Sequence, residues 1–389
     1  MIQTHHLAIG APAAAALRSA ANTGGRSRVV DLGPEHPSRT GLLLIELESR
    51  DDVVTAARIQ PGFNHRSAEK LFEARDYRQL LMLADRHDWH SPFTGELGMA
   101  LVCEQLMGLV PPPRATWLRT LLAEQARIGS HLAHLSFLPH HTQEQGLATR
   151  LRGLRITARE LMLAISGNRV HPMLNRLGGL GNDVDAHWVA RIEQWARDCA
   201  QLAADLDQLV VAGEIGLGVG VLDARLIDGH SLSGPVAAAA GIDRTLRRRN
   251  PYLAYPELAD ELANPGPQLP VDGDAAARFR VLAAEVQQSS RLISRCAETL
   301  ANIDGPVDTK LSKIVKLPEG EAYLAVDAPW GMAGFWLVSR AERTPWRLKL
   351  RTPSLANVQA LETVLVNCPL SQVDVVIASM GWTNGDLDK

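Results

Sequence analysis

The sequence predicts an α+β fold that is mainly helical, with a large central helical bundle between small β-containing N- and C-terminal pieces. Apolar residues recur at spacings of three and four over most of residues 65–212 and again over 275–302, which is typical of amphipathic helices. Short runs rich in β-branched residues before and after these segments are typical of strands. A chain of 389 residues is long enough to bury the core that such a bundle requires.

Composition and charge exclude several classes of protein. The hydrophobic share of 46% and the charged share of 21% are typical of a folded globular chain. The formal net charge of −3 gives no basic footprint, so we expect no nucleic-acid partner. The absence of any CxxC pair excludes a local zinc or iron–sulfur motif and favours a reducing compartment. The four cysteines are Cys103, Cys199, Cys296 and Cys368.

No segment of the sequence is predicted to cross a membrane. The best apolar run, Leu209–Leu222, is too short to span a bilayer and contains Glu214. The opening residues MIQTHH lack the Lys or Arg that begins a signal peptide. Any membrane association is therefore expected to come through a partner.

The N-terminal region is expected to combine a loose arm with a small β subdomain. Residues 1–27 mix Ala, Gly, Ser and Arg, which indicates the arm, and residues 28–61 form the subdomain. Residues 33–41 hold two Pro and two Gly and therefore form a loop, in which His36 is either a turn residue or a site residue. The expected strands are 29–30, 42–48 and 53–59.

The rest of the chain divides into a helical bundle over 62–310 and a C-terminal α/β piece over 311–389 that packs on the bundle. The expected helices of the bundle are 66–75, 77–88, 94–109, 114–138, 142–166, 184–212, 235–248 and 275–302. The expected strands of the C-terminal piece are 321–326, 335–338, 346–351 and 373–378, with a helix over 354–367.

Two histidines on the expected 114–138 helix lie on one surface, because His131 and His134 are three residues apart. This spacing is compatible with a metal pair and with two structural or solvated histidines. The second use is far more common, so we expect no metal site.

The stretch Gly62–Phe93 has the highest density of charged and aromatic groups in the chain. Leucines from Leu80 to Leu83 precede Asp85-Arg86-His87-Asp88-Trp89-His90 directly, and charges beside a buried segment need partners. The stretch is compatible with a surface helical hairpin and, equally, with a functional site.

Eight pieces of the sequence occur in the order found in one protein family. They are GPEHPSRTG (33–41), HRSAEKLFEARDYRQ (65–79), DRHDW (85–89), VPPPRATWLRTLLAEQARIGSHL (110–132), RVHPMLNRLGG (169–179), GVGV (218–221), RLKLRTPSLANVQAL (347–361) and DVVIASMGWTNGDLDK (374–389). With these pieces the chain resembles the D subunit of NADH–quinone oxidoreductase, or respiratory complex I. That family is related to the large subunit of nickel–iron hydrogenases, which implies a hydrogenase-like fold.

The resemblance implies a role in quinone reduction. A D subunit pairs with a small subunit that carries the terminal iron–sulfur cluster, and a quinone enters between the two. This chain would bind no cofactor itself and would be held, with the membrane arm, on the cytoplasmic side of the cell membrane as a peripheral subunit. Arg86 and His171 match the family positions near the partner's cluster, where a fixed positive charge favours the reduced cluster.

The positions that match the quinone head-group site depart from the family. Thr40 stands where the family has a histidine, Trp89 where it has a tyrosine, and His141 where an acidic residue partners that histidine. Thr and Trp donate hydrogen bonds but do not readily release a proton. We therefore expect the protons to come from a nearby histidine; the candidates are His36, His87, His90 and His141.

The hydrogenase branch is excluded, because its two CxxC pairs are replaced by Asp88-Trp89-His90 and Gly381-Trp382-Thr383-Asn384. Trp89, Trp330 and Trp382 either fill the space of a quinone ring or line its pocket. Two functions stay open: a subunit that forms the quinone cavity, and a divergent paralogue that is structural or uses another electron acceptor.

Overall fold

The computed structural model describes residues 3–9, 27–30, 36–37, 43–263 and 270–389. Its architecture is mainly helical with small sheets, which confirms the predicted fold class. Thr40 lies outside the described residues.

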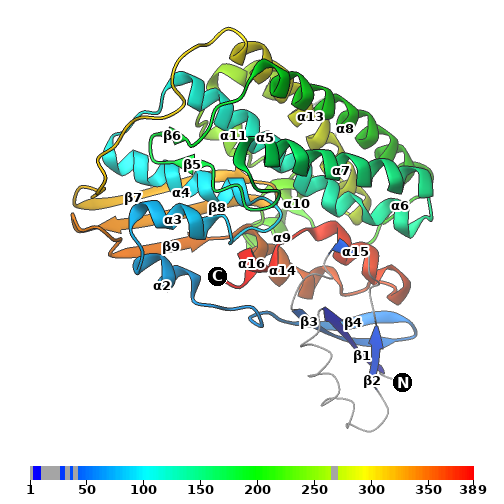
Figure 1. The fold of residues 1–389 in the computed structure, drawn as a ribbon. Coiled ribbons are helices and arrows are strands. Elements are labelled where there is room, and N and C mark those ends of the chain that lie inside the picture. Colours follow the sequence, from blue (N-terminus) through cyan, green and yellow to red (C-terminus); the bar gives the residue numbers. More distant parts are fainter. Residues whose placement is uncertain (1–2, 10–26, 31–35, 38–42, 264–269) are drawn as a thin grey trace.

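Long helices form the body of the molecule. Helix α13 (Ala275–Leu300) lies between α5 (Pro113–Leu135) and α8 (Ala186–Ala212), and α7 (Gln145–Ser166) packs on α8 (Figure 1). Their buried faces hold the main core, which Trp188, Trp195 and Phe279 help to fill. The helices from the N-terminus to α8 are α2 (Ala68–Glu73), α3 (Tyr77–Ala84), α4 (Pro92–Met107), α5 (Pro113–Leu135), α6 (Phe137–His141), α7 (Gln145–Ser166) and α8 (Ala186–Ala212).

Shorter helices connect the body to the C-terminal region. They are α9 (Ala224–Gly229), α10 (Gly234–Ala238), α11 (Leu246–Arg249), η2 (Pro256–Leu258) and α12 (Ala259–Ala263). The later helices are α13 (Ala275–Leu300), α14 (Pro353–Val364), η3 (Leu370–Gln372), α15 (Val373–Met380) and α16 (Asn384–Leu387).

Over the described residues, three small sheets flank the helices. The strands are β1 (Gln3–Ile9), β2 (Ser27–Val30), β3 (Leu43–Arg50), β4 (Val53–Gln60), β5 (Asn175–Arg176), β6 (Gly179–Leu180), β7 (Gly320–Ala328), β8 (Gly331–Ser339) and β9 (Arg347–Arg351). The first sheet has the order β2-β1-β3-β4, the second pairs β5 with β6, and the third has the order β7-β8-β9. Helix α4 packs on β7 and β8, and this second core includes Tyr77 and Phe335.

The C-terminal helices join the N-terminal sheet to the body (Figure 1). The Val54 amide donates to the Cys368 carbonyl at 2.9 Å, and the Asn367 amide donates to the Val54 carbonyl at 2.8 Å. The last residues are buried, with Trp382 and Asp386 both almost inaccessible to solvent. The C-terminal segment is therefore part of the interior and contributes to the site described below.

Three segments differ from the prediction. Residues 3–9, assigned to a loose arm, form β1, which pairs antiparallel with β3 and parallel with β2. The expected helix 235–248 is divided into α10 and α11, because Gly241 adopts a left-handed backbone with φ of 75°. The expected strand 373–378 is helix α15 and is buried, and a short apolar run cannot be assigned to strand or helix by period alone.

Candidate functional site

The charged turn at residues 85–91 lies between α3 and α4. Asp76 caps α3 by accepting from the Arg78 and Gln79 amides, and Pro92 begins α4. Asp85 is the C-cap of α3, so the fold fixes both ends of the turn. The predicted site residues that the structure describes fall into two groups, one around this turn and one around α6.

Arg86 and His171 meet on one buried carboxylate. Arg86 Nη1 forms an ion pair with Asp85 Oδ1, and His171 Nδ1 lies 3.4 Å from the same oxygen. The Asp85 side chain is fully buried, whereas those of Arg86 and His171 are 45% and 29% exposed. Burial raises the pKa of Asp85 above its ordinary value, although both neighbours oppose that shift. Arg86 and His171, which the family motifs indicated, thus form one group at the surface, in which both contact the Asp85 carboxylate.

Glu96 on α4 supports this group, although no sequence motif singled it out. Its Oε2 accepts from the amides of Leu174 and Asn175, each at 2.8 Å, which fixes the chain just after His171. Burial raises the pKa of Glu96 to about 8. The signal that would have found it is a lone carboxylate in the otherwise apolar FTGELGMALV segment.

Trp89 lines a cleft between the charged turn, α5 and α7. Its Nε1 donates to the Arg86 carbonyl at 2.9 Å, and the Arg66 guanidinium lies 5.8 Å from the centre of its ring. The cleft has an empty volume of about 750 Å³, including its open mouth. Its lining consists of Trp89, His90, Pro92, Phe93, Gln125, Ala126, Gly129, Ala133, Arg155, Ala158, Arg159, Met162, Arg169, Val170 and Pro172. This lining is apolar with cationic groups and contains no carboxylate.

Behind the cleft, His90 faces a buried pair of rings. The His90 and His134 ring centres are 5.4 Å apart, and His134 lies against Trp330 with ring centres 4.0 Å apart. Burial, with the charge of Arg155, lowers the pKa of His90 to about 4, so this imidazole is neutral at physiological pH. Trp330 is buried and does not line the cleft.

The C-terminal segment closes the other side of the turn. Thr383 Oγ1 donates to Asp88 Oδ1 at 2.9 Å, and His87 Nε2 lies 3.4 Å from Asp386 Oδ1. A Cβ at Gly385 would lie 2.3 Å from the His87 carbonyl oxygen, so only glycine permits this approach. Burial and the neighbouring Asp386 raise the pKa of Asp88 to about 6.

The two segments that carry the CxxC pairs in the hydrogenase branch therefore touch in this chain, without a thiolate. Over the described residues, no group of three or more His, Cys, Asp or Glu is arranged to hold a metal ion. The donor set at the turn does not fit a nickel–iron centre.

His36 and His141 meet on the C-terminal helix α15. His36 Nε2 lies 3.1 Å from the Asp374 carbonyl oxygen, and His141 Nδ1 lies 3.7 Å from Asp374 Oδ2. Both rings also pack on Phe137, with ring centres 5.5 Å and 5.0 Å away. Burial lowers the pKa of His36, which keeps its imidazole neutral at physiological pH. Asp374 therefore supplies a carboxylate beside His141, the residue for which the sequence predicted a swapped acidic position.

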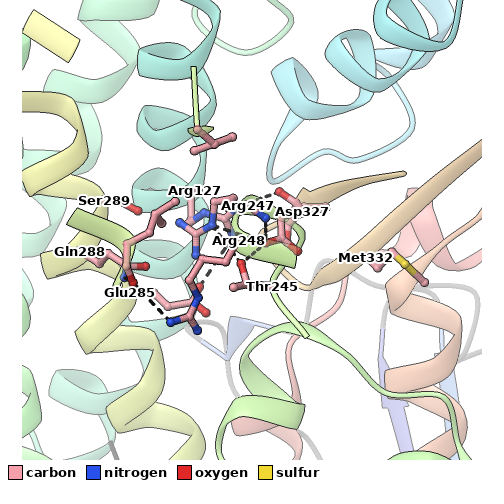
Figure 2. A network of polar contacts seen from close by, with 12 residues as sticks. Arg127, Thr245, Arg247, Arg248, Glu285, Gln288, Ser289, Asp327 and Met332 are labelled. Carbon is pink, nitrogen blue, oxygen red and sulfur yellow. Dashed lines mark hydrogen bonds and ion pairs between the residues drawn. The ribbon is translucent and has the colours of Figure 1, made fainter. Parts of the chain in front are cut away.

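A dense buried ion network lies on the far side of α5, and no sequence motif predicted it (Figure 2). Glu124 accepts from Tyr255 and Ser289 and pairs with Arg247 at 3.2 Å. Arg127 donates to the Asp327 carbonyl at 2.7 Å. Only the (i, i+3) spacing of Glu124 and Arg127 was visible in the sequence.

No helix among the described residues is both long and apolar enough to cross a membrane.

Comparisons with known proteins agree on one family. The family model described as "Respiratory-chain NADH dehydrogenase, 49 Kd subunit" matches residues 149–315 and 309–389. A protein of Salinispora arenicola, named as a D 2 subunit of NADH-quinone oxidoreductase, is 43% identical over 376 residues, which cover 94% of each chain. A D 1 subunit of the same enzyme from Streptomyces coelicolor is 42% identical and covers 93% of this chain and 95% of the relative.

A solved structure extends the likeness to three dimensions. It is a chain in the structure of the membrane-bound sulfane sulfur reductase, an archaeal respiratory membrane complex, with a TM-score of 0.82 and 28% identity. The match covers 92% of this chain and 97% of that chain. Sequence and fold lead to the same conclusion: the chain belongs to the family of the 49 kDa, or D, subunit of respiratory-chain NADH dehydrogenase.

Proposed function

We propose that this chain forms a quinone-reduction cavity with a small, cluster-bearing partner subunit in a complex I-like NADH–quinone oxidoreductase. The observation that carries the proposal is the position of the Trp89 cleft directly beside the Arg86–Asp85–His171 group. A cleft able to hold an aromatic ring thus adjoins a cationic surface that suits an electron-donating partner.

The cleft suits a neutral aromatic ligand with two hydrogen-bond acceptors. Phe93 and Met162 give apolar walls, and the Trp89 indole offers its ring face because its N–H is already bonded to the Arg86 carbonyl. His90 and the arginines of the lining are the polar groups available to bond the two quinone oxygens. Trp89 then orients the ring rather than supplying a proton.

Arg86 and His171 form the face toward the partner. Both are partly exposed, and both are held by Asp85, so their positions are fixed before the partner binds. The partner's iron–sulfur cluster would supply the electrons, and a positive charge near it favours its reduced state. This chain itself binds no redox cofactor in the proposal, and the membrane arm holds the assembly as a peripheral complex on the cytoplasmic side.

A neutral His90 is the donor closest to the proposed ligand. A neutral imidazole releases its ring proton to a reduced quinone oxygen only as its second nitrogen takes up another proton, so His90 would pass a proton on and needs a supply behind it. His36 and His141 form a separate group on α15, and Asp374 beside them supplies an acceptor. We assign the first proton transfer to His90 because it alone among these three histidines lines the cleft.

A second function within the same architecture is the reduction of another electron acceptor. The solved structure that resembles this chain with a TM-score of 0.82 is that of a sulfane sulfur reductase, so a related chain works in a complex named for a different acceptor. Trp89, in place of the family's tyrosine, favours altered chemistry in the cleft. A purely structural paralogue would retain the Arg86–His171 face and lack any turnover.

The test is to isolate the assembled complex and measure NADH oxidation with decylubiquinone and with a short-chain menaquinone. We expect the unaltered complex to oxidise NADH in a quinone-dependent reaction. The double variant Trp89→Tyr with Thr40→His restores the family's residues. We expect it to change a rate of quinone-dependent NADH oxidation that the unaltered complex already has. An assembled complex with no quinone-linked rate that gains one in the double variant would contradict the proposal and favour the paralogue.

A further inference from the structure

Two clefts lie on opposite sides of α5, and a line of buried histidines runs between them. The first is the Trp89 cleft, to which α5 contributes Gln125, Gly129 and Ala133. The second has an empty volume of about 550 Å³. Its lining includes Arg127, Thr245, Arg247, Glu285, Gln288 and Asp327, which Figure 2 shows converging from α5, α11, α13 and β7.

We propose that His90, His134 and His131 form a proton relay that joins the second cleft, at Glu285, to the Trp89 cleft. This inference rests on the proposed function, since it names the source of the protons that the cleft would consume.

The members of this line are linked by a hydrogen bond at one end, by their spacing of one turn on α5 with a shared contact to Trp330, and by a ring contact at the other end. His131 Nε2 lies 2.7 Å from Glu285 Oε2, and the Glu285 side chain is 15% exposed, which gives one end access to the second cleft. His131 and His134 both pack on Trp330, with ring centres 5.5 Å and 4.0 Å away. His134 then faces His90 edge to face, with 5.4 Å between the ring centres, so the two imidazoles are in direct contact.

The unused hydrogen-bonding capacity of these rings is what distinguishes them from structural histidines. Within the described part of the chain, both ring nitrogens of His134 and Nδ1 of His131 are buried and have no hydrogen-bond partner. Leaving a buried polar group without a hydrogen bond is unfavourable, so an apolar side chain would pack against Trp330 at lower cost. Nitrogens kept in this position are available to accept and pass on a proton.

The charges around these histidines disfavour a protonated ring, so a proton is expected to move along the line and not to stay on one histidine. His134 is faced by His90, His131, His36 and Arg155, and burial with these neighbours holds its pKa well below the ordinary value. A proton therefore does not rest on it.

His131 is faced by Glu285, Arg127 and Arg247, and its pKa is also lowered by burial. The Glu285 carboxylate opposes that shift and provides the attraction that brings a proton to this end.

The transfer balances in protons and needs no redox step. Burial raises the pKa of Glu285, but the hydrogen bond with His131 and the charges of His131, Arg127 and Arg247 outweigh it and hold the pKa at about 2, so Glu285 is protonated from solvent in the second cleft only transiently. In that state it passes the proton to His131 Nε2 while His131 Nδ1 releases its own toward His134. The ring is left with its proton on Nε2, donating to the ionised Glu285, and must rotate before a second proton can follow. His134 and then His90 repeat the exchange, so each imidazole keeps one ring proton and one proton reaches the ligand. His131 and His134 touch no ligand and are positioning residues for the proton supply.

The experiment uses the assembled complex with His134→Phe, which keeps an aromatic ring against Trp330 and removes both nitrogens. The relay predicts that quinone-dependent NADH oxidation falls by roughly tenfold or more. NADH oxidation by ferricyanide, which needs no proton from this cleft, is expected to stay unchanged. The solvent isotope effect in D₂O is expected to rise, since proton supply becomes limiting, and a packing defect would not move it.

His131→Gln, which retains a donor to Glu285, is the second variant in case the first does not assemble, and the same loss is expected. His187→Phe on the exposed side of α8 is the matched control. Retention of the quinone-linked rate to within about twofold in an assembled His134→Phe or His131→Gln complex, with an unaltered isotope effect, would overturn the relay alone. Absence of that rate in the unaltered complex would overturn the proposed function together with the relay.

Discussion

Two buried polar regions lie on either side of His131, and they are built in opposite ways. At Glu124 every charge has a partner: Arg127, Arg247, Tyr255 and Ser289 converge on one carboxylate. At His134 the polar atoms are buried against Trp330, and both of its ring nitrogens lack a hydrogen bond to the described residues. The difference indicates that the first region fixes the fold, while the second keeps atoms free for chemistry.

The largest effect on stability is expected from Glu124→Ala. The substitution leaves Arg127 and Arg247 buried with one fewer counter-charge, and breaking a buried pair in this way costs about 3–5 kcal/mol. Denaturant unfolding of the purified chain measures the loss. Glu298→Ala, at a half-exposed ion pair with Arg295, is the control and should change stability by less than about 1 kcal/mol. A small loss at Glu124 would mean that the network is not structural.

Glu96→Gln tests the contrast between Glu124, a carboxylate with cationic partners, and Glu96, a carboxylate that accepts only from neutral amides. Arg247 and Arg127 hold the pKa of Glu124 below its usual value despite its burial, whereas burial raises that of Glu96 to about 8. Because the folded state holds the Glu96 proton more tightly than the unfolded state, its contribution to stability falls as pH rises from the usual carboxyl range to about 8.

A glutamine keeps the acceptor for the Leu174 and Asn175 amides and removes the titration. Stability is therefore expected to rise by roughly 2–4 kcal/mol at alkaline pH and to change little under acidic conditions. Unfolding curves of both proteins across pH measure the difference. A gain that does not depend on pH would show that titration of Glu96 is not its cause.

His134→Phe is expected to leave the fold intact or to stabilise it by about 1 kcal/mol, because it removes buried nitrogens without hydrogen bonds and keeps the ring contact with Trp330. Thermal unfolding of the chain measures this effect separately from turnover. A loss of stability instead would show that the His134 nitrogens are satisfied in solution and would remove the contrast with Glu124.

Arg86→Gln is expected to cost less stability than Glu124→Ala, because the Arg86 side chain is 45% exposed and His171 stays 3.4 Å from the buried Asp85 carboxylate. Its effect on the partner is distinct: the cluster's reduction potential should fall when the positive charge is removed. Potentiometric titration of the assembled complex measures it. Arg197→Gln on α8, with a side chain 50% exposed, is the matched control and should leave the potential unchanged.

The long helices could be predicted from sequence because their apolar residues follow the helical period. Helix α8 is such a case, with Trp188, Ile192 and Trp195 on its buried face. Helix α15 could not be assigned, because all but one of its residues are buried and it has no polar face to reveal the period. Strand β1, which the prediction assigned to a loose arm, was missed for a different reason: its pairing with β3 is a tertiary contact that local composition does not report.

The residues of the candidate site could likewise be predicted only where a local sequence pattern contains them. Arg86, Trp89 and His171 were found because they lie in motifs shared with a known family. The network at Glu124 was not, because Arg247 is 123 residues away along the chain, and the family piece that contains Glu124 does not indicate its partner. Glu96 and His134 likewise acquire meaning only from what they face after folding.

The most direct test of the proposed quinone site is photolabelling of the assembled complex with an azidoquinone, followed by mapping of the labelled peptides. The proposed site predicts labels around Trp89 and around Met162 on α7, where the two walls of the cleft face each other, and their loss when unlabelled quinone competes. Labels confined to the second cleft at Glu285, or labels around Trp89 that quinone does not displace, would contradict it.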